Sequence, residues 1–317
     1  MLHSRPRKAA EVRQMLHGLR LMAEIVVDKR KARDLAEKLV TAYREKEFYF
    51  RLNRKVPETI LPKGIETGTL EHSLYLLYAV SLDSMRQSEY VYGAARRLVT
   101  EYNVRQFEFM HAQEFYHIMD RVMDNGMNRP AETLADAVKI LRDYGGDPRV
   151  MFQDVHGFDQ AVSRLIPMRG VSYDKAALII KNFQKFGYLE LDNPYDASIK
   201  IDRHIIRMSL GNSAVAPLLE GDVVRIDKFR KPLRKLYRDV CREYEIDPVD
   251  LCDAKWLIGS KVCARKSKDI CEEYCPLDCD FLVSTDRKNT LITYPSEMRG
   301  DTKGARIEIQ PSLFEEW

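Results

Sequence analysis

Four cysteines lie in one short segment near the C-terminal end of the chain, at Cys263, Cys271, Cys275 and Cys279. Thiolates this close together repel one another unless a cation or a cluster neutralises their charge. Disulfides usually staple small secreted chains, so a run of four cysteines in a 317-residue chain predicts a metal centre. Ordinary thiols on a cysteine-rich turn are the alternative. Cys241 and Cys252 lack matching spacing, so we expect both to be buried as small apolar side chains.

Apolar residues recur at helical spacing from about residue 11 to residue 255, which predicts a mostly α-helical protein. Leu134, Val138 and Leu141 show this pattern, and Gly145-Gly146 follows where a helix would end. Residues 74–82 form an apolar stretch far short of the roughly 20 residues that cross a bilayer, so we expect a core helix there. After the cysteines, residues 289–294 and 305–310 alternate as short strands do and favour a small C-terminal β-hairpin.

Composition and charge exclude some classes of protein. With 45% hydrophobic and 31% charged residues, the chain suits one large or two ordinary globular domains and not a disordered or membrane-spanning protein. The basic N-terminus has no apolar segment behind it, so we expect the protein to stay inside the cell. A net charge of +3 is too small to indicate nucleic-acid binding by itself. Residues 225–238 are locally basic, either as a solvated helix face or as a phosphate contact.

A tight turn between two amphipathic segments is the strongest local candidate for a binding site. Residues 158–166 predict a helix that Pro167 closes, and a second helix follows from Tyr173. Gly170 in the turn allows a sharp bend and a close approach of the backbone to a ligand. The unpaired N–H groups at the start of the second helix suit a phosphate. By itself this turn is common among helical proteins and does not establish DNA binding.

Several motifs, taken in order, resemble one family. Residues 167–177 resemble the Leu-Pro-Gly-Val-Gly-x-Lys-Thr-Ala hairpin of the helix-hairpin-helix DNA glycosylase superfamily, which includes endonuclease III and adenine glycosylases. Residues 199–207, Ile-Lys-Ile-Asp-Arg-His-Ile-Ile-Arg, are similar to the Val-Asp-x-His-Val-x-Arg segment that holds the catalytic aspartate of that family. Residues 74–98 resemble its first barrel helices, and residues 256–279 resemble its iron–sulfur cluster loop. The resemblance covers roughly residues 70 to 280.

The resemblance implies an all-α fold with two helical domains and a cleft between them. Residues 70–190 are expected to form a six-helix barrel that carries the hairpin. Residues 191–282 are expected to form a second domain with the catalytic aspartate and the cysteine cluster, against which residues 1–69 pack. Residues 283–317 would then be a C-terminal extension.

The resemblance also assigns roles to individual residues. Asp202 is the expected catalytic carboxylate, since a desolvated anion stabilises positive charge on the sugar and can position or deprotonate water. The plainer alternative is that Asp202 caps the helix that follows it. A base in a duplex must be extruded before it reaches such a carboxylate, and a side chain fills the gap. The expected DNA-binding residues are Gly170, Val171, Ser172 and Tyr173 in the hairpin, Leu82, Met85, Arg86 and Gln87 in the wedge loop, and His204. Leu82 and Met85 alternatively complete the core face of the preceding helix.

Two departures from the family pattern affect the chemistry. The four cysteines are spaced C-x7-C-x3-C-x3-C, whereas the family pattern is C-x6-C-x2-C-x5-C, so a [4Fe-4S] cluster is implied and zinc is the alternative. Asp174 stands where lyase-competent members carry their Schiff-base lysine, and Lys175 is one position further on. One residue turns a helix by about 100°. We therefore expect Lys175 to point away from the pocket, with a lysine nucleophile as the alternative.

Together these features predict a base-excision DNA glycosylase that flips a damaged or mismatched base out of duplex DNA and hydrolyses its N-glycosidic bond without lyase activity. We expect a monomer with no membrane association, in the cytoplasm or nucleoid, or in a eukaryotic nucleus. One alternative is an N-glycosidase that acts on a modified nucleoside, nucleotide or RNA. Others are a nucleic-acid-binding module without catalysis and a purely structural metal protein.

Overall fold

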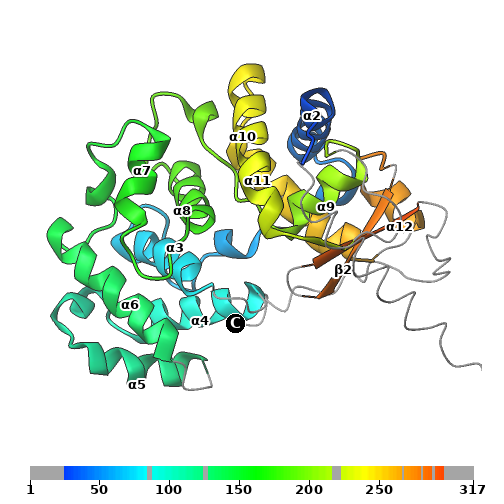
Figure 1. Cartoon of the computed structure of the whole chain (residues 1–317). Helices are drawn as coiled ribbons and strands as arrows, with labels where there is room; N and C mark the ends of the chain where they lie inside the picture. Colours follow the sequence, from blue (N-terminus) through cyan, green and yellow to red (C-terminus); the bar gives the residue numbers. More distant parts are fainter. Residues whose placement is uncertain are drawn as a thin grey trace, which may run out of the picture.

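A computed structural model describes residues 25–83, 88–123, 128–215, 223–265, 268–279, 281–287 and 290–295. The predicted mostly α-helical fold is confirmed, because helices form most of this part of the chain (Figure 1). The described side chains pack into two separate hydrophobic cores, and the chain passes from one to the other between Ala197 and Ile199. The division at residues 69, 190 and 282 stays a prediction. No helix in the described ranges is long and apolar enough to cross a membrane.

The first core contains buried residues between Leu74 and Ala197. Its α-helices are α3 (Leu70–Leu82), α4 (Ser88–Glu101), α5 (Ala112–Met123), α6 (Asn128–Leu141), α7 (Phe158–Leu165) and α8 (Tyr173–Lys185). Short 3-10 turns connect them at η3 (Val104–Phe109), η4 (Arg142–Tyr144), η5 (Val150–Phe152) and η6 (Pro194–Asp196). Helix α3 is buried from His72 to Leu82, as expected of a helix that is apolar on every face. The predicted core helix over residues 74–82 is therefore confirmed.

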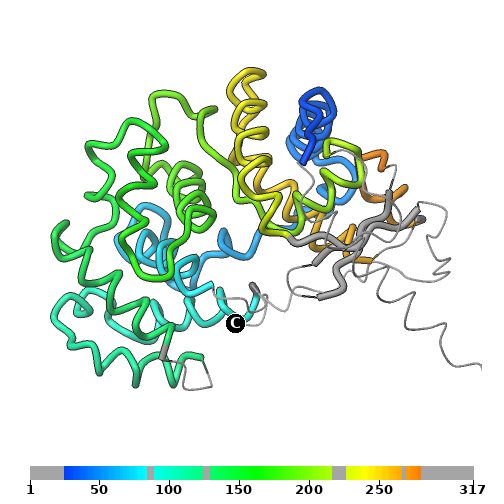
Figure 2. Tube along the Cα trace, viewed as in Figure 1, coloured from blue at the N-terminus to red at the C-terminus, as the bar shows by residue number. Residues whose placement is uncertain are grey.

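The second core combines the N-terminal helix with segments that follow residue 198 (Figure 2). Its elements are α2 (Lys29–Glu45), η1 (Phe48–Leu52), α9 (Arg203–Gly211), α10 (Asp227–Tyr244), α11 (Pro248–Leu257), the π-helical turn η7 (Ile258–Val262), η8 (Cys263–Arg265) and α12 (Lys268–Tyr274). The short turn η2 (Pro57–Thr59) instead contacts α3 and α4 of the first core. Helix α2 packs against α10 and α11, far from it in sequence. Cys241 and Cys252 are buried in this core, as predicted.

A small antiparallel sheet of order β1-β3-β2 completes the described chain. Strand β2 (Phe281–Arg287) pairs with β3 (Thr290–Pro295), and β3 pairs in turn with β1 (Val223–Arg225). The predicted C-terminal hairpin therefore exists, but its partner strand is residues 281–287. The sequence prediction instead paired residues 289–294 with residues 305–310, which lie outside the described residues. The physical reason is proximity, because a two-residue connection after residue 287 closes a hairpin at once.

Helix ends follow the sequence signals. Asp28, Thr69 and Asp247 each accept a hydrogen bond from a backbone N–H in the first turn of α2, α3 and α11. Helix α6 passes into the 3-10 turn η4, which ends at Gly145 with φ 63°. Glycine adopts this left-handed conformation without steric cost, so the predicted helix end at Gly145 is confirmed.

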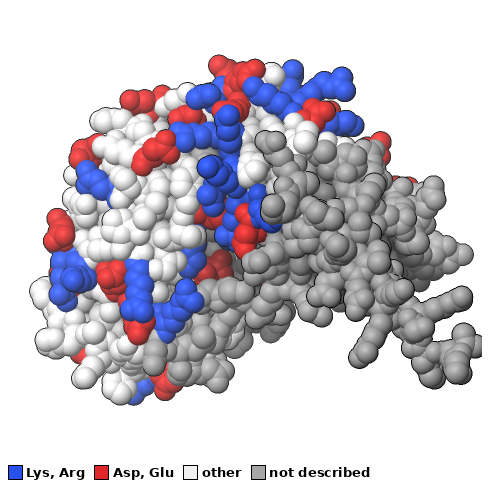
Figure 3. All heavy atoms as spheres, in the orientation of Figure 1, with Lys and Arg blue, Asp and Glu red and all other residues white. Residues whose placement is uncertain are grey.

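Ion pairs hold the two cores together along their boundary. Arg230, Arg234 and Arg238 are spaced four residues apart on α10, and we call them the arginine ladder. All three pair with aspartates of the segments that end the first core, from α7 to η6. On the face shown in Figure 3, basic side chains likewise lie beside acidic ones. Part of the basic stretch at residues 225–238 therefore makes internal contacts, while Lys231 and Lys235 are exposed.

Candidate functional site

The hairpin between α7 and α8 is built around Gly170. Its φ is +80°, and a Cβ added there would lie 3.0 Å from Oγ1 of Thr133 on α6. Any other residue would therefore be strained in its backbone and crowded against α6. Ser172 begins α8, and its side chain accepts a hydrogen bond from the backbone N–H of Lys175 at 3.4 Å. The turn thus presents an exposed glycine and an exposed serine at the start of a helix.

The other two predicted hairpin residues face the protein. Val171 is buried in the first core. The ring of Tyr173 packs edge-on against Phe158 and lies under the Arg234 guanidinium, 4.5 Å from ring centroid to Cζ. These positions support the hairpin from within, so Gly170 and Ser172 are the fully exposed members of the predicted hairpin set, and Tyr173 is half-buried.

Asp174 joins the start of α8 to the arginine ladder. Its buried carboxylate accepts hydrogen bonds from Arg234 Nε at 3.0 Å, from Arg234 Nη2 at 2.8 Å and from Arg230 Nη1 at 3.3 Å. It also accepts from the backbone N–H of Ile201 at 3.3 Å. Charge-assisted and partly bidentate bonds of this kind fix orientation strongly. Asp174 is thus an anchor between the cores.

Lys175 points in a different direction from its neighbour. Its Nζ donates to the backbone oxygen of Ser81 at the end of α3, at 2.8 Å. Burial lowers the pKa of Lys175 to about 8; the Asp83 carboxylate opposes this shift, whereas Lys200 and Arg129 add to it. Asp174 turns toward α10 and Lys175 toward the end of α3, while the expectation that Lys175 points away from the pocket stays a prediction.

Asp202 begins α9 at the boundary of the second core. Its Oδ1 accepts hydrogen bonds from the backbone N–H groups of His204 at 2.9 Å and Ile205 at 3.3 Å. Its Oδ2 lies 3.0 Å from Nζ of Lys255, a lysine on α11 that is only 1% exposed and that also donates to the backbone oxygen of Lys200. The helix-capping role proposed for Asp202 is confirmed.

The surroundings of Asp202 keep it negatively charged. Burial by itself would raise its pKa, but the charges of Lys255 and Lys200 and the hydrogen bond from Lys255, joined in acid by the protonated His204, outweigh burial and hold the pKa well below its usual range. The side chain keeps 17% of its surface exposed. Asp202 is therefore an ionised carboxylate in a largely desolvated position, where charge acts over a short range with little screening.

His204 is enclosed by the cysteine-bearing segment. A Cβ added to Gly259 would lie 2.5 Å from Cβ of His204, so only glycine fits opposite this ring. The ring meets Trp256 edge-on at 6.5 Å, and its Nδ1 is buried without a hydrogen-bond partner among the described residues. Burial lowers the pKa of His204 to about 4, so the imidazole is neutral near pH 7. A neutral, packed imidazole is a weaker phosphate contact than the prediction assumed.

Asp83 links the two cores beside Asp202. It follows α3 in the first core, and its Oδ2 lies 3.4 Å from Nζ of Lys200. Burial alone would lower the pKa of Lys200, but the carboxylates of Asp83 and Asp202 outweigh it and raise that pKa. We call the five residues Asp83, Lys175, Lys200, Asp202 and Lys255 the boundary cluster.

Sequence patterns did not single out Asp83, Lys200 or Lys255. Lys255 carried one usable signal, a charged residue in the otherwise largely apolar turn of residues 251–258, which implies a buried partner. Asp83 and Lys200 are neighbours only in space. Their 117-residue separation in sequence leaves no local pattern to detect.

The predicted wedge loop is only partly described. Leu82 is 1% exposed and belongs to the first core, so it completes the buried face of α3 and cannot enter DNA from this position. The prediction of Leu82 as a wedge is therefore replaced by its core alternative. Met85, Arg86 and Gln87 lie outside the described residues.

The four clustered cysteines lie around α12 and the turns beside it. Cys263 and Cys275 are hydrogen-bonded neighbours, and this contact together with the charge of Arg207 lowers the pKa of Cys263 against the effect of burial. The contact with Cys263 and burial raise the pKa of Cys275, and Cys279 adds to this rise. Within the described ranges, no three His, Cys, Asp or Glu side chains lie in an arrangement that could hold a metal ion. The described positions of these cysteines therefore show one pair of contacting thiols and not a complete metal site.

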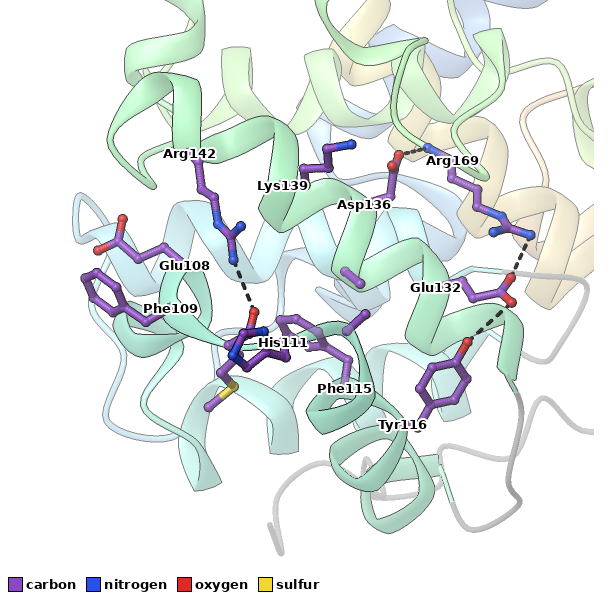
Figure 4. A pocket seen from close by; sticks show the side chains of 13 residues that line it. Glu108, Phe109, His111, Phe115, Tyr116, Glu132, Asp136, Lys139, Arg142 and Arg169 are labelled. Carbon is purple, nitrogen blue, oxygen red and sulfur yellow. Dashed lines mark hydrogen bonds and ion pairs between the residues drawn. The ribbon is translucent and has the colours of Figure 1, made fainter.

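A surface hollow of about 670 Å³ lies away from the boundary cluster, between η3, α5 and α6 (Figure 4). Its wall includes Phe115 and Tyr116, and Arg169 closes one side by pairing with Glu132 at 2.7 Å. The backbone N–H of Arg169 also donates to Asp136 at 2.6 Å. These contacts brace the residue before Gly170 against α6, which is a structural role for this wall.

Comparisons with known proteins give limited information. No protein-family model matches the chain, and no curated protein matches it significantly. One solved structure that matches is that of a trapped endonuclease III–DNA covalent intermediate, an estranged-adenine complex. The match has 15% sequence identity, covers 72% of this chain and 85% of that chain, and has a TM-score of 0.42. A TM-score this low does not establish a common fold.

Proposed function

We propose that the protein is a base-excision DNA glycosylase that hydrolyses the N-glycosidic bond of a damaged or mismatched base. The observation that carries the proposal is Asp202, a carboxylate that is nearly enclosed yet ionised and that lies where the two cores meet. Cleavage of an N-glycosidic bond builds positive charge on the sugar. A fixed anion in a desolvated site stabilises that charge in the transition state.

The substrate is duplex DNA from which the target nucleotide is flipped into the boundary between the cores. A base in a duplex cannot otherwise reach a recessed carboxylate. The exposed turn at Gly170 and Ser172, followed by the N-terminus of α8, supports backbone contact without base reading. We assign the wedge to Met85 and the reading of the orphaned partner base to Arg86 or Gln87, and we propose that the protein acts as a monomer.

The test is strand scission after hot alkali on labelled duplexes that carry uracil, a thymine–guanine mismatch, oxidised guanine, adenine opposite oxidised guanine, alkylated purines or hypoxanthine. Wild type is compared with Asp202→Asn, and Asp159→Asn serves as the control because the side chain of Asp159 is 67% exposed at the surface. We expect excision of at least one base and a loss of about 10²- to 10³-fold in Asp202→Asn alone. Intact duplexes throughout, or full activity in Asp202→Asn, would contradict the proposal.

A lyase activity at the resulting abasic site is the second candidate, and Lys175 favours it. An amine with a pKa of about 8 is still mostly protonated near physiological pH, but its neutral fraction is far larger than that of an ordinary lysine and can attack the sugar aldehyde as a Schiff-base nucleophile. Borohydride reduction during turnover would trap a covalent protein–DNA complex in wild type and not in Lys175→Met. If no complex forms in wild type, the enzyme is a monofunctional hydrolase.

We propose that Cys263, Cys271, Cys275 and Cys279 hold a [4Fe-4S] cluster, with zinc as the alternative. The support is the run of four cysteines and the contact between Cys263 and Cys275. Such a centre would keep the segment after η7 folded and takes no part in hydrolysis. Iron and sulfide analysis of protein purified without oxygen distinguishes the two metals, and Cys241→Ala is the control that keeps the metal.

A further inference from the structure

Asp202 is well suited to remain an anion and poorly suited to accept a proton. Both of its carboxylate oxygens are engaged, Oδ1 by two backbone N–H groups and Oδ2 by the Lys255 amine. The same contacts weaken its basicity. A general base works best when its pKa lies near the working pH, because it must first take the proton and then release it. Water activation therefore falls to another group near Asp202.

Asp83 is the acceptor in the boundary cluster that fits this task. It follows α3 of the first core, whereas Asp202 begins α9 of the second, and Lys200, whose Nζ lies 3.4 Å from Asp83 Oδ2, interacts electrostatically with both carboxylates. The Asp83 side chain is 14% exposed. His204 is a poorer choice because its ring is packed against Gly259 and Trp256, and Lys175 already donates to the Ser81 oxygen.

We propose that Asp83 is a second catalytic carboxylate and the general base of the hydrolysis, an inference that rests on the proposed glycosylase function. The Asp83 carboxylate takes a proton from water while the water oxygen bonds to C1′ of the flipped nucleotide. The C1′–N bond breaks, and its electron pair leaves with the base. The proton held on Asp83 then passes to the departing base, so that the products are the neutral base and an abasic sugar bearing a hydroxyl. Asp202 remains an anion throughout and faces the positive charge on the sugar.

Lys200 makes this division of labour electrostatically feasible. Two carboxylates that share a site repel, and one of them is then forced to stay protonated. A lysine that interacts with both allows both to be ionised at once. Lys200 is thus a positioning residue for the pair.

The experiment measures single-turnover excision on the best duplex substrate for wild type, Asp83→Ala and Glu89→Ala, with and without added sodium formate. Glu89 is the matched control because it has the same arrangement as Asp83. It is a carboxylate on an element of the first core, and it pairs at 3.1 Å with a lysine on an element of the second core, Lys261. We expect Asp83→Ala to lose about 10²- to 10⁴-fold in rate. Formate, which supplies a small carboxylate to the emptied space, is expected to restore at least about 10-fold of that loss. Glu89→Ala is expected to keep the wild-type rate and to ignore formate.

The outcomes separate this inference from the proposed function. Wild type that leaves every duplex intact refutes the glycosylase and the base together. If wild type excises the base and Asp83→Ala does so at the same rate, only the role of Asp83 as the general base is refuted. The same holds if Asp83→Ala is slower and formate does not restore its rate. Circular dichroism checks that each variant folds, and Asp83→Ser is judged by the same criteria if Asp83→Ala does not fold.

Discussion

Asp174 and Lys175 are adjacent in sequence, but their side chains serve different sides of the molecule. Asp174 binds Arg234 of α10, with 2.8 Å between its Oδ2 and Arg234 Nη2, whereas Lys175 donates to the backbone oxygen of Ser81 in the buried last turn of α3. A rotation of about 100° per helical residue separates the two directions. The ladder contact therefore determines which of the two side chains faces the boundary cluster.

Removing the charge of Asp174 is expected to weaken the attachment of the hairpin. Asp174→Asn leaves Arg230 and Arg234 beside a neutral amide in a buried position. We expect the free energy of unfolding to fall by about 2 to 4 kcal/mol, measured by urea denaturation. Asp159→Asn is the control: its carboxylate is 67% exposed and Arg238 keeps Asp196, so we expect a loss below about 1 kcal/mol. Equal losses would show that Asp174 is not an anchor.

Replacing Lys255 with methionine is expected to remove the one cation that is hydrogen-bonded to the buried Asp202 carboxylate, with Lys200 left as a more distant charge. We expect Lys255→Met to lower the free energy of unfolding by about 3 to 5 kcal/mol at neutral pH. The pKa of Asp202 then rises, because burial is opposed by fewer favourable contacts. Protonation relieves the buried charge, so the difference from wild type should shrink as the pH falls. Denaturation curves across this pH range measure both effects.

Lys261→Met is the matched control for Lys255→Met. The pair of Lys261 with Glu89 is 42% and 43% exposed, and exposed pairs contribute about 0 to 1 kcal/mol. A loss in Lys255→Met no larger than in Lys261→Met would contradict the buried ion pair.

Much of the fold could be predicted because its signals are local. The apolar run of residues 74–82, the glycine at position 145 and the capping aspartate at position 202 each specify a helix or its end from a few neighbouring residues. The partner of the C-terminal strand could not be chosen this way, since two nearby segments alternate equally well. Strand pairing depends on chain connection as well as pattern.

A site residue could be predicted only where its own segment of sequence holds a recognisable motif. Asp202 could be identified from its own motif, but Lys255 and Asp83 come from α11 and the end of α3. Their roles arise when two cores meet, and sequence spacing holds no information on that juxtaposition. The partners of Asp174 could not be predicted for the same reason, because the arginines that bind it lie 56 to 60 residues away in the sequence.

A side chain at position 170 is expected to strain the hairpin more than one at position 187. Both glycines flank α8 with positive φ, +80° and +71°, but a Cβ at Gly187 meets nothing within 4 Å, whereas at Gly170 it meets Thr133. We expect Gly187→Ala to cost about 1 to 2 kcal/mol from its backbone alone and Gly170→Ala to cost more. In a Thr133→Ala background, the loss in free energy of unfolding caused by Gly170→Ala should shrink, whereas the loss caused by Gly187→Ala should stay the same. Additive effects at both positions would contradict the contact.

Stability is expected to fall in mild acid because two histidines are buried as neutral rings. Burial lowers the pKa of His72 and of His204 to about 4, from 6.5 in the unfolded chain. Between pH 6.5 and about pH 4, both histidines are protonated in the unfolded chain but neutral in the folded protein. The free energy of unfolding therefore decreases as the pH drops from 6.5 toward 4 and levels off below about 4. Asp202 contributes only at lower pH, because the stability that comes from its lowered carboxylate pKa is lost only below about pH 3.8.

Urea denaturation at several pH values measures how steeply the free energy of unfolding depends on pH. This slope should be shallower for His72→Gln combined with His204→Gln. His156→Gln, with a ring 69% exposed, should leave the slope unchanged, and an unaltered slope in the double variant would refute the assignment.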